Sequence, residues 1–136
     1  MISAEALAEL SSRIDTIEEA YEYLLAYASQ GLASDGESDT GRQAREYLKR
    51  CDTALTNFGD FLTGFTERLG LEPAAAYQAF ITVIDRDARD AQAAVQLVLA
   101  QTSISSQLVD NLNASIHLRA LLTDLFLIDE VLKGHR

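Results

Sequence analysis

Apolar residues recur along this chain at alternating spacings of three and four positions, which is the pattern of one face of an α-helix. The pattern runs through four segments, at about residues 4–31, 41–69, 73–101 and 106–133. In the first segment the repeating positions are Leu7, Leu10, Ile14, Ile17, Tyr21, Leu24 and Ala28. No segment shows the period of two that is typical of a half-buried strand. The pattern therefore predicts four long helices and no sheet.

Residues that favour helix starts and stops lie at the ends of these segments. Ser3 precedes the first segment as an N-cap, residues 40–43 form a Thr-x-x-Gln capping box, and Pro73 fits a first helical turn. Gly70 and Gly134 follow the second and fourth segments, where a residue that ends a helix is expected. We therefore predict one domain over residues 1–136, folded as an all-α, antiparallel up-down-up-down four-helix bundle.

The fourth segment differs from the others because it is apolar on two sides. One stripe begins at Leu118 and ends at Leu132. A four-helix bundle buries only one arc of each helix, so a second arc requires another surface to cover it. We predict that the second arc is an interface with a second copy of the chain, in a homodimer, or with another protein. Its residues are Leu112, Ile116, Ala120, Leu127 and Val131.

The charge of the chain restricts its partners. The sequence has 11 Lys and Arg against 21 Asp and Glu, which gives a net charge of −10. Binding to phosphates requires a cationic face, so this charge argues against nucleic acids and against anionic membrane surfaces. No apolar run reaches the ~18 residues that a membrane-spanning helix needs. Solubility is the simplest interpretation of the acidity, and a basic partner protein or mimicry of a nucleic acid are the alternatives.

The single cysteine, Cys51, excludes a disulfide framework and is typical of a reduced, cytoplasmic protein. Residues 1–10 contain acid and lack the apolar core of a secretory signal, which agrees with a cytoplasmic location. Cys51 falls on the apolar stripe of the second segment. We therefore expect it to be buried and unreactive.

Motifs that carry chemistry are absent from the sequence. There is no phosphate-binding loop, no Gly-x-Gly-x-x-Gly and no Cys-x-x-Cys, and no His follows a Glu by three positions as in ferritin-like di-metal bundles. Phosphotransfer domains are small acidic bundles in which Lys and Gly occupy the third and fourth positions after a reactive His. Ala120 and Leu121 occupy those positions after His117. The sequence therefore favours a non-enzymatic protein with no cofactor and no metal.

A group of polar residues offers an alternative. If antiparallel helices are joined by loops centred near residues 36, 71 and 104, five titratable residues fall near one level: Glu18, Tyr21, Cys51, Asp87 and His117. In such a layer His117 would be a ligand or general base, and Asp87 would orient it. This alternative makes the chain a binding protein for a small molecule or metal, or an enzyme. The favoured hypothesis remains a regulatory or adaptor bundle that binds a protein through its fourth segment.

Overall fold

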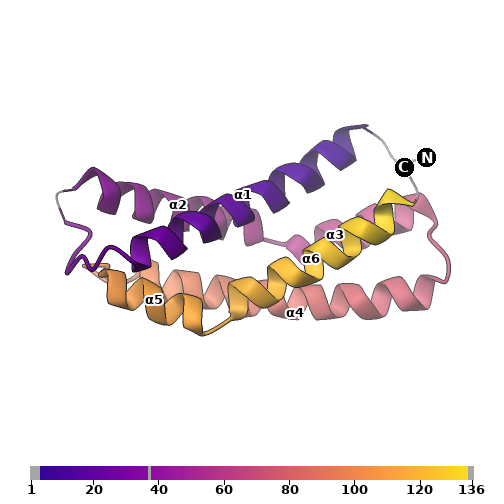
Figure 1. Cartoon of the computed structure of the whole chain (residues 1–136). Coiled ribbons are helices and arrows are strands. Elements are labelled where there is room, and N and C mark those ends of the chain that lie inside the picture. The colour runs from indigo at the N-terminus through magenta and orange to yellow at the C-terminus, as the bar shows by residue number, and fades with distance from the viewer. Residues whose placement is uncertain (1–3, 37, 135–136) are drawn as a thin grey trace.

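The computed structural model describes residues 4–36 and 38–134, and the regular structure in these ranges is entirely helical (Figure 1). Ser3, the expected N-cap of the first helix, lies outside them. The all-α prediction is confirmed, since these ranges contain no strand. The six helices of the described residues are α1 (Ala4–Ala28), α2 (Asp39–Leu55), α3 (Phe58–Leu69), α4 (Ala74–Leu99), α5 (Ser106–Ala114) and α6 (His117–Lys133).

Two of the four expected helices are interrupted. Residues 41–69 are divided between α2 and α3, and residues 106–133 between α5 and α6. A residue with a left-handed backbone lies at each break: Asn57 has φ 55° and Ile116 has φ 63°. A left-handed residue cannot continue a right-handed helix, so the chain changes direction there. The prediction of four uninterrupted helices was therefore wrong, because apolar spacing does not report the backbone conformation of a single residue.

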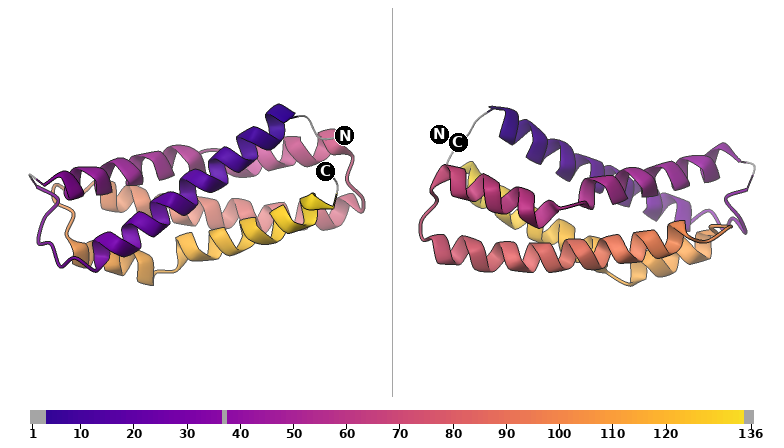
Figure 2. Two further views of the ribbon diagram at one scale, coloured as in Figure 1. Left: turned by 45° about the horizontal axis from the view of Figure 1, so that its top comes forward. Right: turned by 180° about the vertical axis from the view of Figure 1, so that it is seen from behind.

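The helices lie lengthwise in an elongated molecule (Figures 1 and 2). α2 and α3 follow one another along one side, and α4 packs against both of them. α5 and α6 also follow one another, and they pack against α4 and against α1. α1 completes the arrangement by packing against α2. Both termini lie at one end of the molecule, and the α1–α2 and α4–α5 connections lie at the other (Figure 1).

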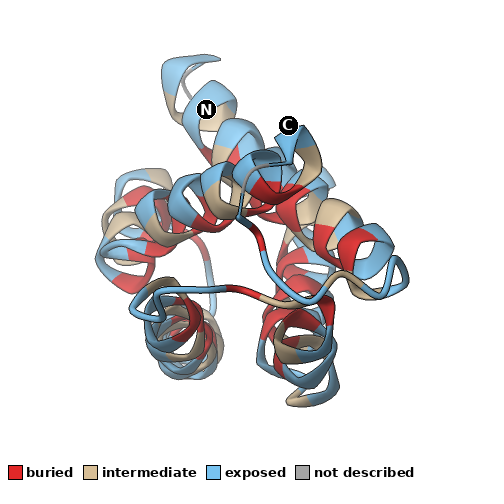
Figure 3. Cartoon of the chain, turned by 90° about the vertical axis from the view of Figure 1, so that its left-hand side faces the viewer, coloured by how far each residue is buried: buried red, intermediate tan, exposed pale blue. Residues whose placement is uncertain are grey.

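The core is formed by the sides of the helices that face one another (Figure 3). In α1 the predicted stripe positions Leu10, Ile14, Ile17 and Leu24 are buried. Other predicted positions of this stripe, such as Tyr21, are only partly buried at the edge of the core. The apolar spacing therefore identified the buried side of α1 and misjudged its width.

The helix ends follow the sequence in part: Pro73 lies directly before α4 as its N-cap and not within its first turn. Gly70 ends α3 with φ 60°, as predicted, and Gly134 follows the last residue of α6. Ser105 caps α5, since its Oγ accepts a hydrogen bond of 3.0 Å from the backbone N–H of Leu108. The expected capping box at residues 40–43 was wrong. Ser38 caps α2 instead, because its hydroxyl accepts from the N–H of residue 41 and the helix begins at residue 39.

Buried polar contacts join the chain at the end that holds the α1–α2 and α4–α5 connections. The Tyr27 hydroxyl donates to the carbonyl oxygen of Ile104 at 2.7 Å, and the Ser106 hydroxyl donates to the carbonyl oxygen of Tyr27 at 2.7 Å. Asp35 accepts from the N–H of Ile104 at 2.6 Å and from Nε of Arg45 at 2.9 Å. We call these five residues, Tyr27, Asp35, Arg45, Ile104 and Ser106, the closed end.

Asp35 is the central acceptor of the closed end. Burial alone raises the pKa of a carboxyl group, but the hydrogen bond from Ile104 and the bond and charge of Arg45 outweigh it and hold the pKa of Asp35 below its usual value. Arg45 also donates to the carbonyl oxygens of Leu99 and Gln101, both at 3.2 Å. The carboxylate and its arginine therefore connect the α1–α2 loop to the end of α4 and the start of α5.

Candidate functional site

Most of the large exposed apolar side chains of the described residues belong to α4 and α6. Leu25 of α1 is one of the large apolar side chains that face solvent in the described residues. The others belong to α4, to α6 or to the residue before α6, and they are Val83, Leu97, Ile116, Phe126, Leu127 and Val131. Contiguous exposed apolar surface is uncommon on proteins that act alone. The α4 and α6 surface is therefore the first candidate for a contact with another molecule.

An apolar groove lies between the first turns of α4 and the last turns of α6. It has a volume of about 300 Å³ and is open to solvent. Its walls are apolar apart from one tyrosine hydroxyl. They are formed by Pro73, Ala76, Tyr77, Phe80, Leu127, Ile128 and Val131. We call it the α4–α6 groove. Apolar side chains that covered it would remove its walls from water, which favours binding by about 25 cal/mol for each Å² buried.

The residues predicted for an interface are divided by the structure. Leu127 and Val131 line the groove and are 55% and 40% exposed. Ile116 is exposed at the break between α5 and α6, and Ala120 is half-buried. Leu112 is buried in the core, because the break shifts the helical phase of α5 relative to α6. Leu112 therefore does not belong to the exposed face.

A pair of carboxyl groups follows the groove along the same helix faces. Asp87 lies one turn after Val83 on α4, and Asp124 lies one turn before Leu127 on α6. The two carboxyl groups lie within reach of one another. Burial first, and then the hydrogen-bonding and negative charge of Asp87, raise the pKa of Asp124 to about 7. We call Asp87 and Asp124 the carboxyl pair.

The carboxyl pair has an unsatisfied acceptor. Oδ2 of Asp124 is buried, and within residues 4–36 and 38–134 no N–H or O–H group donates to it. A proton on Asp124 can be donated to Asp87, which explains how two acids remain in contact without a cation. With a pKa near 7, Asp124 gains or loses this proton close to neutral pH. The pair is therefore an acidic, half-buried site beside the groove.

The predicted polar layer of Glu18, Tyr21, Cys51, Asp87 and His117 is not brought together. His117 is the first residue of α6 and is exposed, whereas Cys51 is fully buried in α2. Asp87 contacts a second aspartate and not His117. Glu18 and Tyr21 are half-buried on α1, and Glu18 faces a shallow acidic hollow. The loop-centred register failed because it assumed an unbroken helix through residues 115 and 116.

The buried cysteine is confirmed, and its environment makes it a weak nucleophile. Cys51 has no exposed surface. Burial, with a smaller contribution from the charge of Asp52, raises the pKa of the thiol to about 12. The thiolate is the reactive form, and a pKa this high leaves almost none of it at neutral pH. In the part of the chain that the structure describes, no three His, Cys, Asp or Glu side chains are placed to hold a metal ion.

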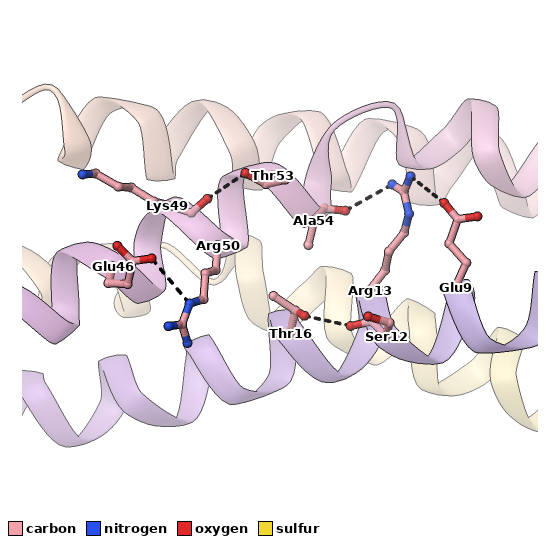
Figure 4. A pocket seen from close by; sticks show the side chains of 9 residues that line it. All are labelled: Glu9, Ser12, Arg13, Thr16, Glu46, Lys49, Arg50, Thr53 and Ala54. Carbon is pink, nitrogen blue, oxygen red and sulfur yellow. Dashed lines mark hydrogen bonds and ion pairs between the residues drawn. The ribbon is translucent and has the colours of Figure 1, made fainter.

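A second hollow, of about 530 Å³, lies between α1 and α2 (Figure 4). Eight of its nine lining residues are polar or charged, and three of them are cations. The lining residues are Glu9, Ser12, Arg13, Thr16, Glu46, Lys49, Arg50, Thr53 and Ala54. By volume and charge it is the competing candidate for a binding site, with an anion as its natural ligand.

Two of the three cations of this hollow are already engaged by the chain. Arg13 donates to the carbonyl oxygens of Ala54 and Thr56, at 3.4 and 3.0 Å, and to the Glu9 carboxylate at 3.2 Å. Arg50 pairs with a glutamate one turn away, at 3.6 Å. Figure 4 shows the Lys49 side chain directed away from α1. An anion would have to replace these contacts, so the α4–α6 groove is the better candidate.

Sequence reasoning missed Asp124 and the α4 wall of the groove. A signal was present, because Asp124 interrupts the apolar run of the fourth segment just before Leu125, and Asp87 interrupts the apolar arc of the third segment. Two acids that interrupt facing apolar arcs of an antiparallel pair are candidates for mutual contact.

The described helices are all too short or too polar to cross a membrane. The candidate sites for a function are the residues of the groove and the carboxyl pair. Comparison with known proteins adds no further constraint: no family model, no curated protein and no solved structure matches this chain.

Proposed function

We propose that this chain is a non-enzymatic interaction protein, a regulatory or adaptor module that binds another protein through the α4–α6 groove. The observation that carries the proposal is the groove itself, an apolar hollow of about 300 Å³ that the described residues leave open to solvent. A furrow between two packed helices is suited to the side chains of a third helix, which place an anchor every three or four residues. The proposed ligand is therefore an amphipathic helix of a partner protein.

The charge of the chain supports a partner other than a second copy. Two copies, each with a net charge of −10, repel one another, whereas a basic protein is attracted. A homodimer through the same face is the alternative outcome, and it would show in the molecular mass in solution. The cytoplasmic location suggested by the single cysteine stays a prediction.

The contacts of the titratable residues support a role without catalysis. The thiol of Cys51 is buried and protonated, and His117 lies on the surface away from it. General acid–base or nucleophilic chemistry requires such groups within hydrogen-bond reach of one another. The ligand-binding alternative gains no support from the five residues on which it rested.

Two matched variants test the proposal. Leu127→Glu places a charge in the groove, and Leu25→Glu makes the same change at a similarly exposed leucine of α1. The probe is a synthetic amphipathic peptide with leucines on one helical face, titrated into the full chain by calorimetry. We expect Leu127→Glu to weaken binding at least tenfold and Leu25→Glu to leave it unchanged. Absence of binding, or equal losses in both variants, would contradict the proposal.

A further inference from the structure

We infer that the partner helix carries a lysine or arginine that binds the Asp87–Asp124 carboxyl pair while its apolar side chains fill the α4–α6 groove. This inference rests on the proposed function and adds the chemistry of the partner. It specifies that the partner helix carries a cation at one end of its row of apolar side chains. An apolar groove alone would not require that cation.

The carboxyl pair and the groove lie in one line. Asp87 is one turn beyond Val83 and two turns beyond Phe80, and Asp124 precedes Leu127 by one turn and Val131 by two. One turn of helix advances 5.4 Å. A helix lying in the groove can therefore reach the pair with a side chain one turn beyond its last apolar anchor. The expected partner pattern is apolar residues at helical spacing followed by Lys or Arg three or four positions later.

The carboxyl pair has no cation partner among the described residues, where neither acid forms an ion pair. Arg89 binds Asp85 at 2.9 Å, and Arg86, next to Asp87 in sequence, is exposed on α4 and forms no ion pair with either acid. Asp87 and Asp124 are both half-buried, so part of each side chain still faces solvent. An ammonium or guanidinium group can approach the pair from that side and supply the missing charge. A second copy of this chain would bring a further carboxyl pair, so a basic helix is the better complement.

Binding of a cation is linked to the proton that the pair holds. The groups around Asp124 are few: Asp87 faces it from α4, where Arg86 and Asp90 are close in sequence, and the α1 positions that point into the core are apolar. On α6 the residues one turn away are uncharged. Because the pKa of Asp124 is about 7, a cation that lowers it should release up to about half a proton at pH 7.

The experiment compares two peptides that differ at one position. Both carry the same leucine face, and one turn beyond it one peptide has Lys and the other Gln. Each is titrated into the full chain by calorimetry at pH 7, in two buffers with different ionisation enthalpies. We expect the Lys peptide to bind about tenfold tighter and to release about half a proton, as a charge-assisted bond at a partly desolvated pair implies.

Variants of the carboxyl pair test whether these two residues cause the preference for Lys and the proton release. Asp87→Asn and Asp124→Asn each keep the side-chain shape, and each should abolish both the preference for Lys and the proton release. Asp90→Asn is the matched control, because it removes the same charge from an exposed position one turn further along α4. Circular dichroism confirms that each variant is folded before titration.

The outcomes separate the inference from the proposed function. Equal binding of the two peptides, with continued sensitivity to Leu127→Glu, would overturn the inference and leave the groove as a docking site. A preference for Lys that Asp90→Asn reduces as much as Asp87→Asn would also overturn it, because general charge would then be the cause. Failure of both peptides to bind would contradict both proposals.

Discussion

Asp35 at the closed end is buried and Asp124 beside the groove is half-buried, and their surroundings shift their pKa values in opposite directions. Asp35 meets donors from its own chain, an N–H at 2.6 Å and an arginine at 2.9 Å, and its pKa is lowered. Asp124 meets another acid, and its pKa is raised to about 7. One carboxylate is fully supplied with donors inside the fold, and the other is left with an acceptor that nothing in the described chain satisfies.

The difference separates structural polar groups from polar groups that are available to a partner. At the closed end Asp35 and Arg45 bind each other and also bind Ile104 and Leu99, which are distant in sequence, so the carboxylate stabilises the fold. Beside the groove the carboxyl pair brings an acid of α4 and an acid of α6 together, next to apolar walls that are open to solvent. We therefore assign stability to the first region and recognition to the second.

The largest expected effect is the loss of Asp35. Asp35→Ala leaves the buried N–H of Ile104 and the Arg45 guanidinium without their acceptor, and removal of one partner of a buried pair costs about 3 kcal/mol of unfolding free energy. Chemical denaturation measures this cost. Asp39→Ala is the control, because Asp39 is an exposed acid that pairs with Arg42 on the surface, and its loss should cost less than about 1 kcal/mol. Equal losses of unfolding free energy in Asp35→Ala and Asp39→Ala would contradict the assignment of a stabilising role to Asp35.

The two carboxyl groups should give opposite pH dependences of stability. The pKa of Asp35 is lowered by folding, so its contribution is present above the unfolded pKa near ~4 and is lost as the pH falls through the folded value. Folding raises the pKa of Asp124, so the folded state holds the proton more tightly. Stability from Asp124 is complete below the unfolded pKa of ~4 and is lost as the pH rises through about 7.

Asp124→Asn tests the second of these dependences. The variant should flatten the decline in unfolding free energy between about pH 4 and pH 7, by roughly 1 kcal/mol after allowance for partial solvent screening. Denaturation curves of the wild type and the variant at several pH values measure the change. A decline that Asp124→Asn leaves intact would show that another group is responsible.

Cys51→Ala should cost about 1 kcal/mol, because the substitution removes one buried sulfur and leaves a small cavity in the core. The native thiol should also resist a thiol reagent at neutral pH until denaturant is added, given its pKa of about 12. Rapid stoichiometric labelling of the folded protein would contradict the structural role of Cys51.

The smallest expected effect on stability lies in the groove. Leu127 is 55% exposed, so Leu127→Glu should change the unfolding free energy by less than about 0.5 kcal/mol while it weakens peptide binding. Leu125→Ala, two residues earlier in the chain at a fully buried position, should cost about 3 kcal/mol. Equal costs for the two changes, measured by denaturation, would mean that Leu127 belongs to the core.

The sequence predicted the helical class and most buried positions because the apolar spacing of three and four records which side of a helix is buried. Leu118, Leu121 and Leu125 were placed correctly for this reason. The breaks at Asn57 and Ile116 depend on the backbone of one residue, and neither is the glycine that usually marks a left-handed position. Leu127 and Val131 were identified from the second apolar arc of the fourth segment. That a partner protein covers them is a proposal. The carboxyl pair was missed because contact across helices depends on register.

The most direct test of the account is a map of where an amphipathic helix binds. Backbone chemical shifts of the isotope-labelled full chain, followed during titration with the Lys peptide, report which residues it contacts. We predict changes concentrated at Tyr77, Phe80, Asp87, Asp124 and Leu127, with none at Arg13 or Arg50 in the hollow between α1 and α2. Changes concentrated at that hollow, or spread evenly over the surface, would contradict the assignment of recognition to the α4–α6 groove.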